Sequence, residues 1–364
     1  MSHRLSLRFA HASRRVRGNA THLIAVAAAI QLAACGEAPI ASAPKMFEPG
    51  APARSLTLGS ITNIGSLGSG GTIATAISNT SMVAGASVTT QGGYHAFIWT
   101  QSGGMKDLGT LPNGTSSIAW GVNSSGQVVG DSYDGAGKSH AFLWTAASGM
   151  KDLGTLPGAS ESLARGINEA GQVVGYSSGT IGLHAFVWSA SAGMVDLDPQ
   201  GGFRTAEAIN NKGMIVGYGI APNTSGINAY VWTPERGIHW LPNLGGDNSE
   251  AFAISDAGLI GGSSNLASGA SVFHAVMWTS GVARDLGTFG GTWANVRAIG
   301  PNGEAFGDYT LPNDDLTSRG FRWTPTFGME DLTNATGIGI PWAVNRELRV
   351  VGSQYVIKIP RVGY

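Results

Sequence analysis

The residue types best suited to bind a ligand occupy one variable position in a repeated tetrapeptide. The chain contains seven segments of the pattern Ala-x-Ala-Ile, in which the flanking residues stay small or branched. The second residue varies in size and charge; in chain order it is Thr75, Trp120, Arg165, Glu207, Phe252, Arg297 and Trp342. Aromatic rings can stack on sugar rings, and charged side chains can hold carboxylates or hydroxyls. These seven residues are therefore the candidate ligand-binding set.

The same residues could instead fill space or pair with one another, as Glu207 could with Arg165. A position that is constant across the copies serves the repeat, whereas a position that varies among constant neighbours is free to serve a ligand. Both interpretations, ligand binding and channel filling, stay open from the sequence.

A regular tryptophan spacing defines the repeat that must position these residues. Six tryptophans follow one another at intervals of 45, 44, 44, 46 and 45 residues: Trp99, Trp144, Trp188, Trp232, Trp278 and Trp323. Each ends a segment such as His140-Ala-Phe-Leu-Trp144. Asp-Leu-Gly follows three of them, and it is extended to Asp-Leu-Gly-Thr-Leu at Asp107 and Asp152. A fixed period of this length is typical of propellers and other repeat folds.

Each unit offers four strand candidates, which we name A to D. In the second unit they are residues 119–122 (A), 127–132 (B), 140–144 (C) and 150–155 (D). The A–B connection has Asn first and Gly fourth, which suits a tight hairpin. Strands A and B are rich in Ala, Gly and Val, and such small residues fit the crowded inner end of a radial sheet. Strand A therefore lies innermost in this prediction, with its variable residue at the mouth of a central channel near the D–A loop.

The two ends of the repeat array complement each other. Residues 54–68 match only strand D, whereas residues 340–364 supply A, B and a degraded C. Together they complete a seventh unit and leave no free sheet edge. The sequence predicts an all-β, seven-bladed propeller of four-stranded repeats over residues 54–364, closed by pairing of the N-terminal and C-terminal strands.

The repeat motif resembles that of a known family. The His-Ala-Phe-x-Trp segment followed by Asp-Leu-Gly-Thr-Leu is similar to the HAF-repeat family of bacterial extracellular proteins, over about residues 55 to 360. The resemblance implies export and a repeat architecture, and it implies no established reaction.

The N-terminus has the layout of an export signal. Five arginines precede the apolar run Leu23–Ile30, and small residues then lead to Cys35, the single cysteine. Leu32-Ala33-Ala34-Cys35 is similar to the lipobox of bacterial lipoproteins, which implies cleavage before Cys35 and its acylation. We predict a signal peptide over 1–34, a lipidated Cys35 with a tether over 35–53, and attachment to the outer membrane or cell surface.

Charge and motifs exclude several classes of function. Without the five signal arginines, 17 of the 22 Lys and Arg residues remain against 23 Asp and Glu residues, a net charge of about −6. We therefore expect no basic surface for nucleic acid. No nucleophile, metalloprotease or phosphate-binding motif is present. No metal or other cofactor is predicted. The acidic B–C loops around Asp131 and Asp308 lack the ligand number of a recognised calcium site.

Other recurrent residues are predicted to be structural. His95, His140, His184 and His274 each open strand C, and an aspartate recurs in strand D. We expect each histidine to bond within its own blade, and the periodic tryptophans to pack between blades.

Three hypotheses for function follow. The first is a non-enzymatic binding module for carbohydrate or another envelope ligand, the second a scaffold for an envelope protein, and the third a polysaccharide hydrolase or lyase. Glu161, Glu207, Asp247 and Glu250 are the carboxylates that would have to meet in an enzyme.

Overall fold

A computed structural model of the chain describes residues 59–267, 271–333 and 339–360. The predicted signal peptide, Cys35 and the tether lie outside the described residues. Within the described ranges, no helix has the length and apolarity needed to cross a membrane.

The described residues form seven four-stranded antiparallel sheets, the blades. Blade 1 contains β2 (Thr72–Ile77), β3 (Val83–Val88), β4 (Tyr94–Thr100) and β5 (Gly104–Asp107). Blade 2 contains β6 (Gly114–Val122), β7 (Val128–Asp134), β8 (Ser139–Thr145) and β9 (Gly149–Asp152). Blade 3 contains β10 (Ala159–Ile167), β11 (Val173–Gly179), β12 (Gly182–Ser189) and β13 (Gly193–Asp196). In each blade these are strands A to D in order.

The remaining blades repeat this plan. Blade 4 contains β14 (Arg204–Ile209), β15 (Ile215–Ile220), β16 (Ile227–Thr233) and β17 (Gly237–Trp240). Blade 5 contains β18 (Ser249–Ile254), β19 (Ile260–Asn265), β20 (Phe273–Thr279) and β21 (Val282–Gly287). Blade 6 contains β22 (Ala294–Ile299), β23 (Ala305–Leu311), β24 (Asp314–Thr324) and β25 (Gly328–Asp331).

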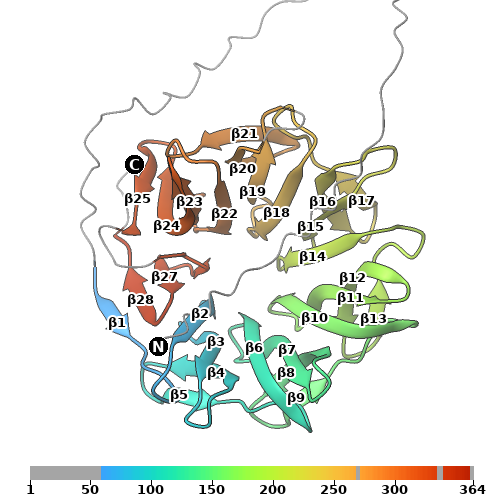
Figure 1. Cartoon of the computed structure of the whole chain (residues 1–364), viewed down its shortest axis with the longest axis vertical. Coiled ribbons are helices and arrows are strands. Elements are labelled where there is room, and N and C mark those ends of the chain that lie inside the picture. The colour runs from blue at the N-terminus through green and yellow to red at the C-terminus, as the bar shows by residue number, and fades with distance from the viewer. Residues whose placement is uncertain (1–58, 268–270, 334–338, 361–364) are drawn as a thin grey trace, which may run out of the picture. The chain divides into compact units, whose positions relative to one another are not determined.

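The seventh blade is completed by the N-terminal strand, as predicted. β26 (Ala343–Val344), β27 (Arg349–Gly352) and β28 (Tyr355–Lys358) are joined by β1 (Ile61–Asn63), in the order β1-β28-β27-β26. The β1–β28 pair is antiparallel, with Thr62 opposite Val356. Figure 1 shows this meeting of the two ends of the described chain.

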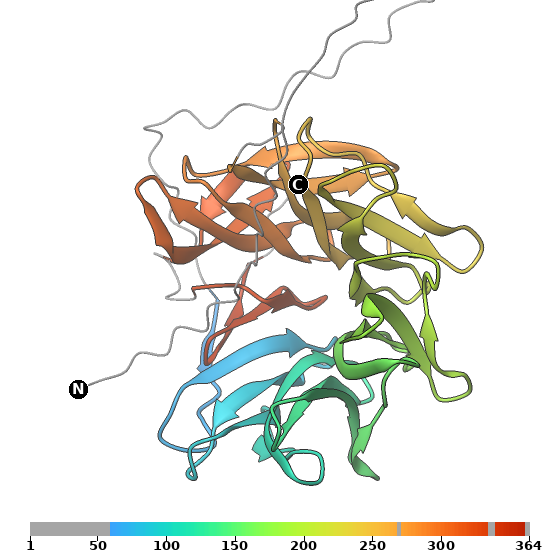
Figure 2. The same cartoon turned by 45° about the vertical axis from the view of Figure 1, so that its right-hand side comes forward.

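The seven A strands surround a central axis. Each A strand contacts the A strand of the next blade, from β2 through β6, β10, β14, β18 and β22 to β26, and β26 contacts β2 again. The ring of blades is visible in Figures 1 and 2. The seven-bladed propeller is therefore confirmed.

The tryptophans of strand C pack between blades. Trp144, Trp188, Trp278 and Trp323 are buried. Cations from the D strand of the preceding blade cover three of these rings: Lys106 lies 5.0 Å from the Trp144 ring centroid, and Arg284 lies 4.7 Å from that of Trp323. This confirms their predicted role in the core.

A β-bulge interrupts the inner strand of blades 1 to 6 at the variable position. In β6, for example, Ala119 pairs with Gly130 and Gly121 with Val129, so Trp120 is the extra residue. The other five bulges centre on Thr75, Arg165, Glu207, Phe252 and Arg297. In blade 7 the Trp342 amide donates to the carbonyl of Val351, the partner of Ala343. A bulge re-aims the side chain of the inserted residue.

The bulge also explains the constant glycine of strand B. A Cβ atom on Gly85, Gly130, Gly175, Gly217, Gly262 or Gly307 would lie 1.8 to 2.0 Å from a carbonyl oxygen of the facing A strand. No side chain can be accommodated at that distance without moving the backbone.

Gly130→Ala should therefore lower the free energy of unfolding by about 3 kcal/mol, since the new methyl group overlaps the Ile118 carbonyl oxygen. Gly135→Ala, in the B–C loop of the same blade, is the matched control, because a Cβ there meets nothing within 4 Å. Urea unfolding of both variants measures the difference. Equal stabilities would contradict the proposed close approach.

Removing the residues up to Asn63 should destabilise the propeller and cause association, because β28 then becomes an exposed sheet edge. Thermal unfolding and size-exclusion chromatography of the truncated chain measure both effects. A truncated chain that stays monomeric and as stable as the parent would refute the closure.

Candidate functional site

The structure brings the variable residues together around the axis. They form a chain of contacts in which guanidinium groups lie over aromatic rings. The Arg165 Cζ atom lies 4.7 Å from the Trp120 ring centroid, and the Arg297 Cζ atom lies 4.5 Å from that of Trp342. Arg297 also lies 5.8 Å from the Phe252 ring. Such cation–π contacts stabilise each arginine in place.

A small residue in blade 1 lets two tryptophans meet. Trp342 of blade 7 and Trp120 of blade 2 contact edge to face, with ring centroids 6.3 Å apart. Thr75 occupies the position between them; it is buried, and its hydroxyl donates to the Ala119 carbonyl oxygen at 2.6 Å. The tryptophan pair therefore spans the blade whose own residue is too short to reach the axis.

Glu207 and Arg165 form the pair anticipated from the sequence. The Arg165 Nε atom lies 3.6 Å from Glu207 Oε2. Burial raises the pKa of Glu207, the positive charge of Arg165 opposes this, and the nearby Glu250 raises it further. Of the four carboxylates considered from the sequence, Glu207 and Glu250 are thus coupled electrostatically. Glu161 instead accepts a hydrogen bond from Ser178, and Asp247 from Asn265.

A second variable position, missed from the sequence, supports the first. The residue after the constant glycine of strand B is Ala86, Asp131, Tyr176, Tyr218, Ser263, Asp308 or Ser353. The Trp120 Nε1 atom donates to Asp131 at 2.6 Å, and Arg297 Nε donates to Asp308 at 2.5 Å. Comparison of the seven copies would have found these residues by the same test of variability.

Asp131 is a buried carboxylate whose pKa is strongly raised. It is 1% exposed, and burial raises its pKa from an ordinary value of 3.8 to about 6. The hydrogen bond from Trp120 and the charge of Arg165 oppose this rise. Asp131 therefore depends on both ring residues for its charge.

Aromatic residues link the axis to the D–A side of blade 4. Tyr218 lies 5.7 Å from Phe252 and 6.4 Å from Phe203, between ring centroids. Phe203 precedes β14 and is 36% exposed. Trp240, at the end of β17, packs against Tyr230, and Trp293, directly before β22, packs against Phe273.

The axial cavity opens on the other side, among the A–B hairpins. It has a volume of about 700 Å³ and a collar of seven aliphatic side chains, one from each blade: Ile77, Val122, Ile167, Ile209, Ile254, Ile299 and Val344. These residues lie two positions after the variable residues, which are thus nearer the A–B hairpins than the predicted D–A loops. Comparison among the seven copies does not reveal this collar, because its residues are constant and constant residues are expected to serve the scaffold.

Polar hairpin residues form the rim of this cavity and join neighbouring blades. The backbone N–H of Glu169 donates to Asn211 Oδ1 at 2.9 Å, and that of Asn211 donates to Asp256 Oδ1 at 3.0 Å. Blade 6 has Pro301 at this position, and Arg346 of blade 7 instead reaches Asp256 at 3.1 Å.

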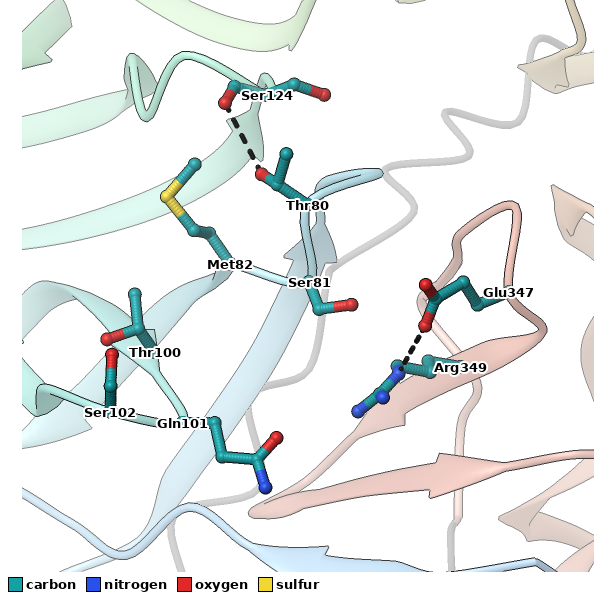
Figure 3. A pocket seen from close by; sticks show the side chains of 9 residues that line it. All are labelled: Thr80, Ser81, Met82, Thr100, Gln101, Ser102, Ser124, Glu347 and Arg349. Atoms are coloured by element: carbon teal, nitrogen blue, oxygen red, sulfur yellow. Dashed lines mark hydrogen bonds and ion pairs between the residues drawn. The ribbon is translucent and has the colours of Figure 1, made fainter.

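A further hollow lies at the junction of blades 7, 1 and 2. It is about 690 Å³, and its lining includes Thr80, Gln101, Glu347 and Arg349. Figure 3 shows Arg349 paired with Glu347 on one side and Thr80 bonded to Ser124 on the other. Each of these two interactions lies within one wall of the hollow. The lining contains no aromatic residue.

The four histidines bond within their blades, as predicted. Each Nδ1 atom lies 2.9 to 3.0 Å from a strand D carboxylate: His95 with Asp107, His140 with Asp152, His184 with Asp196 and His274 with Asp285. In blade 4 both partners change together, to Asn228 and Trp240. In blade 6 Arg319 lies 3.8 Å from Asp331 instead.

The acidic B–C residues separate in space. Asp131 and Asp308 turn to the ring residues, and Asp134 accepts hydrogen bonds from the backbone of its own loop. Among the described residues, no group of three or more His, Cys, Asp or Glu side chains is arranged to hold a metal ion.

Comparison with solved structures supports the fold. The chain is similar to virginiamycin B lyase from Staphylococcus aureus, with a TM-score of 0.54 and 11% identity over 83% of this chain and 99% of that one. It is also similar to TolB from Acinetobacter baumannii, with a TM-score of 0.47 and 10% identity over 65% of this chain, and it spans 58% of the TolB chain. At these identities the likeness concerns the fold alone.

No protein-family model matches the sequence, and a comparison with curated proteins gives no match. The resemblances to HAF repeats and to a lipobox therefore rest on the sequence motifs alone.

The buried Asp131 should make stability depend on pH. Because its folded-state pKa is raised, the native chain binds a proton more tightly than the unfolded chain, so stability falls as pH rises from about 4 to about 6. Asp131→Asn should remove about 3 kcal/mol of this change. Urea unfolding of parent and variant across this pH range measures it. Parallel pH profiles would contradict the assigned pKa.

Proposed function

We propose that this protein is a non-enzymatic binding module of the cell envelope, and that its propeller axis takes a carbohydrate. The observation that carries the proposal is the ring of aromatic and charged side chains at the bulged position of the inner strands. Tryptophan faces can stack on the apolar face of a sugar, and charged side chains can bond its hydroxyls.

Ligand binding explains the composition of the ring better than channel filling. Apolar side chains would fill the axis without the desolvation penalty that buried charges carry. The ring instead contains two arginines and a glutamate, and 19% of the Arg165 side chain and 22% of the Arg297 side chain remain exposed. Polar groups held in fixed positions beside aromatic rings are typical of binding sites.

Export and a lipid anchor complete the proposal. The basic segment, the short apolar run and Cys35 in Leu-Ala-Ala-Cys support a lipoprotein at the outer membrane or cell surface. Acyl chains on Cys35 would hold the propeller at the membrane without a spanning segment.

A polysaccharide hydrolase or lyase is an alternative candidate, and one observation favours it. Burial raises the pKa of Glu207 and the negative charge of Glu250 raises it further, and a general acid requires a raised pKa. Release of reducing ends from a polysaccharide, abolished by Glu207→Gln, would establish this alternative. Docking of an envelope protein on the loops is the remaining candidate.

Binding to a glycan panel tests the main proposal. The Trp120→Ala/Trp342→Ala variant should lose at least tenfold in affinity, because both stacking surfaces are removed. Trp240→Ala, on the outermost strand of blade 4, is the matched control and should bind as the parent does. Isothermal titration gives the affinities, and circular dichroism checks the fold.

The outcomes separate the candidates. A glycan bound by parent and control but not by the double variant supports an axial carbohydrate site. Equal binding by all three proteins would place the ligand elsewhere. If the parent binds no glycan, the carbohydrate proposal fails and a protein partner becomes the better hypothesis.

The anchor makes its own prediction. Cys35→Ser expressed from the full chain should move the protein from the membrane fraction to the soluble periplasmic fraction and abolish labelling by radioactive palmitate. An unchanged membrane fraction would contradict acylation at Cys35.

A further inference from the structure

The cavity among the A–B hairpins is separate from the ring of variable residues. Its volume is about 700 Å³, and among the described residues its lining contains the collar and the hairpins but none of the seven variable residues. Those residues contact one another instead, as Arg165 contacts Trp120 and Arg297 contacts Trp342. Cavities of this size commonly bind small molecules. The proposed carbohydrate function leaves this cavity unassigned.

The collar gives the cavity a fixed aliphatic wall. Each blade contributes the residue that ends its inner strand, which is isoleucine in five blades and valine in two. These side chains also pack into the core; Ile209, for example, belongs to a cluster with Val174 and Leu197. Ile254 and Ile299 are only half-buried, so part of their aliphatic surface stays exposed. Covering such surface with an apolar group is favourable, and the wall is formed before a ligand arrives.

The polar groups of the rim bond one another. The Glu169 carboxylate accepts a hydrogen bond from the Ser124 backbone N–H at 2.9 Å and another from its hydroxyl at 2.7 Å. The Asp256 carboxylate accepts from the Asn211 side-chain amide at 3.0 Å and from Arg346 at 3.1 Å. A polar ligand would compete with these bonds, whereas an aliphatic group gains free energy by covering the collar. The lining therefore favours an aliphatic ligand.

The described chain begins on the side of the propeller where this cavity opens. The Gly59 backbone N–H donates to the Lys358 carbonyl oxygen. Lys358 lies opposite Arg349, the first residue of β27 after the A–B hairpin of blade 7. The proposed anchor, Cys35, precedes Gly59 by 24 residues. Acylation of Cys35 would thus connect the A–B side of the propeller to the membrane, which makes membrane lipid the nearest source of aliphatic chains.

We propose that the cavity among the A–B hairpins binds one acyl chain of a membrane lipid. The acyl chain lies against the collar, and the lipid headgroup stays at the polar rim. The membrane as the source of this chain rests on the proposed lipid anchor, whereas the affinity of the cavity for an acyl chain does not. Neither depends on carbohydrate binding by the ring.

Soluble lysolipids test the affinity for an acyl chain. The protein is the mature chain with Cys35→Ser, which carries no acyl group of its own to compete. The probes are hexanoyl, octanoyl, decanoyl and dodecanoyl lysophosphatidylcholine below their micelle concentrations, with glycerophosphocholine as the probe without a chain. Affinity measured by isothermal titration should rise at least fourfold for every two added methylenes, because each methylene that enters the cavity leaves water.

A collar variant and a matched control place the binding. Ile254→Thr/Ile299→Thr introduces two hydroxyls into the wall and should weaken dodecanoyl lysophosphatidylcholine binding at least tenfold. Ile181→Thr/Ile220→Thr makes the same change at two exposed residues in or beside the B–C loops, on the opposite side, and should bind as the parent does. Circular dichroism checks that both variants are folded.

A variant of the cavity mouth gives a second readout without a change in the core. Ala257 is exposed and lines the cavity, so Ala257→Trp should narrow the mouth and weaken the same binding several-fold. Ala170 has the same position in the hairpin of blade 3, is exposed, and does not belong to the lining. Ala170→Trp is therefore the control and should leave the affinity unchanged.

Vesicles test the membrane as the source of the acyl chain. The full-length mature chain is placed on phosphatidylcholine vesicles whose acyl chains carry a diazirine, and irradiation is followed by mass spectrometry of the peptides. Peptides containing Ile254 or Ile299 should be labelled, and those containing Ile181 or Ile220 should not. A chain that does not associate with the vesicles contradicts the anchor and the membrane source together.

The results separate the claims. Lysolipids that bind no more tightly than glycerophosphocholine overturn the proposed acyl-chain site and leave the carbohydrate proposal standing. Binding that the folded collar variant and Ala257→Trp both retain, or that the Ile181→Thr/Ile220→Thr control loses equally, overturns the placement in the cavity. Labelling of vesicle-bound protein only at Ile181 or Ile220 overturns the membrane as the source.

Discussion

The β-bulge on the inner strand is the constraint on which the rest of the propeller depends. It inserts one residue into strand A of blades 1 to 6, and the Trp342 amide bond to Val351 repeats the pattern in blade 7. The inserted residue is turned to the axis, while the facing carbonyl oxygen comes so close to strand B that only glycine fits, as at Gly130. The bulge thus explains both why strand B has a constant glycine and why the inserted residue of strand A can vary.

The constant residues stabilise each blade and its contacts with the next one, so the bulged residue is not needed for either. His140 and Asp152 tie strand C to strand D, Lys106 covers Trp144 across a blade boundary, and Asn168 donates to the Asn210 carbonyl oxygen of the next blade. In blade 4 both partners change, to Asn228 and Trp240, whereas blade 6 keeps the aspartate and pairs Asp331 with Arg319. The axial residues contact one another by different means in each blade, which is expected of a surface shaped by a ligand rather than by the fold.

The blade count, the closure and the variable ring were all predictable, because each depends on a period that seven copies reveal. Two features were not. The collar of Ile77 and its equivalents is one of them. Its residues are constant because each blade of the closed ring contributes the same side chain to the axis. Comparison among the copies cannot distinguish such residues from those that only stabilise the blade. The position of Trp120 along the axis depends on the bulge and on the length of β6. The contact between Trp120 and Trp342 depends on the small Thr75 between them. Such contacts arise only from three-dimensional placement.

The central claim is that the bulged residues form a ligand site on the axis. A crystal structure of the mature propeller soaked with the oligosaccharide that it binds most tightly tests this claim directly. The account predicts a sugar ring stacked on Trp120 or Trp342, with hydroxyls within hydrogen-bond distance of Arg165 or Arg297, whose side chains are partly exposed. A sugar bound away from the axis, with Arg165 and Arg297 still stacked on the tryptophans as they are here, would contradict it.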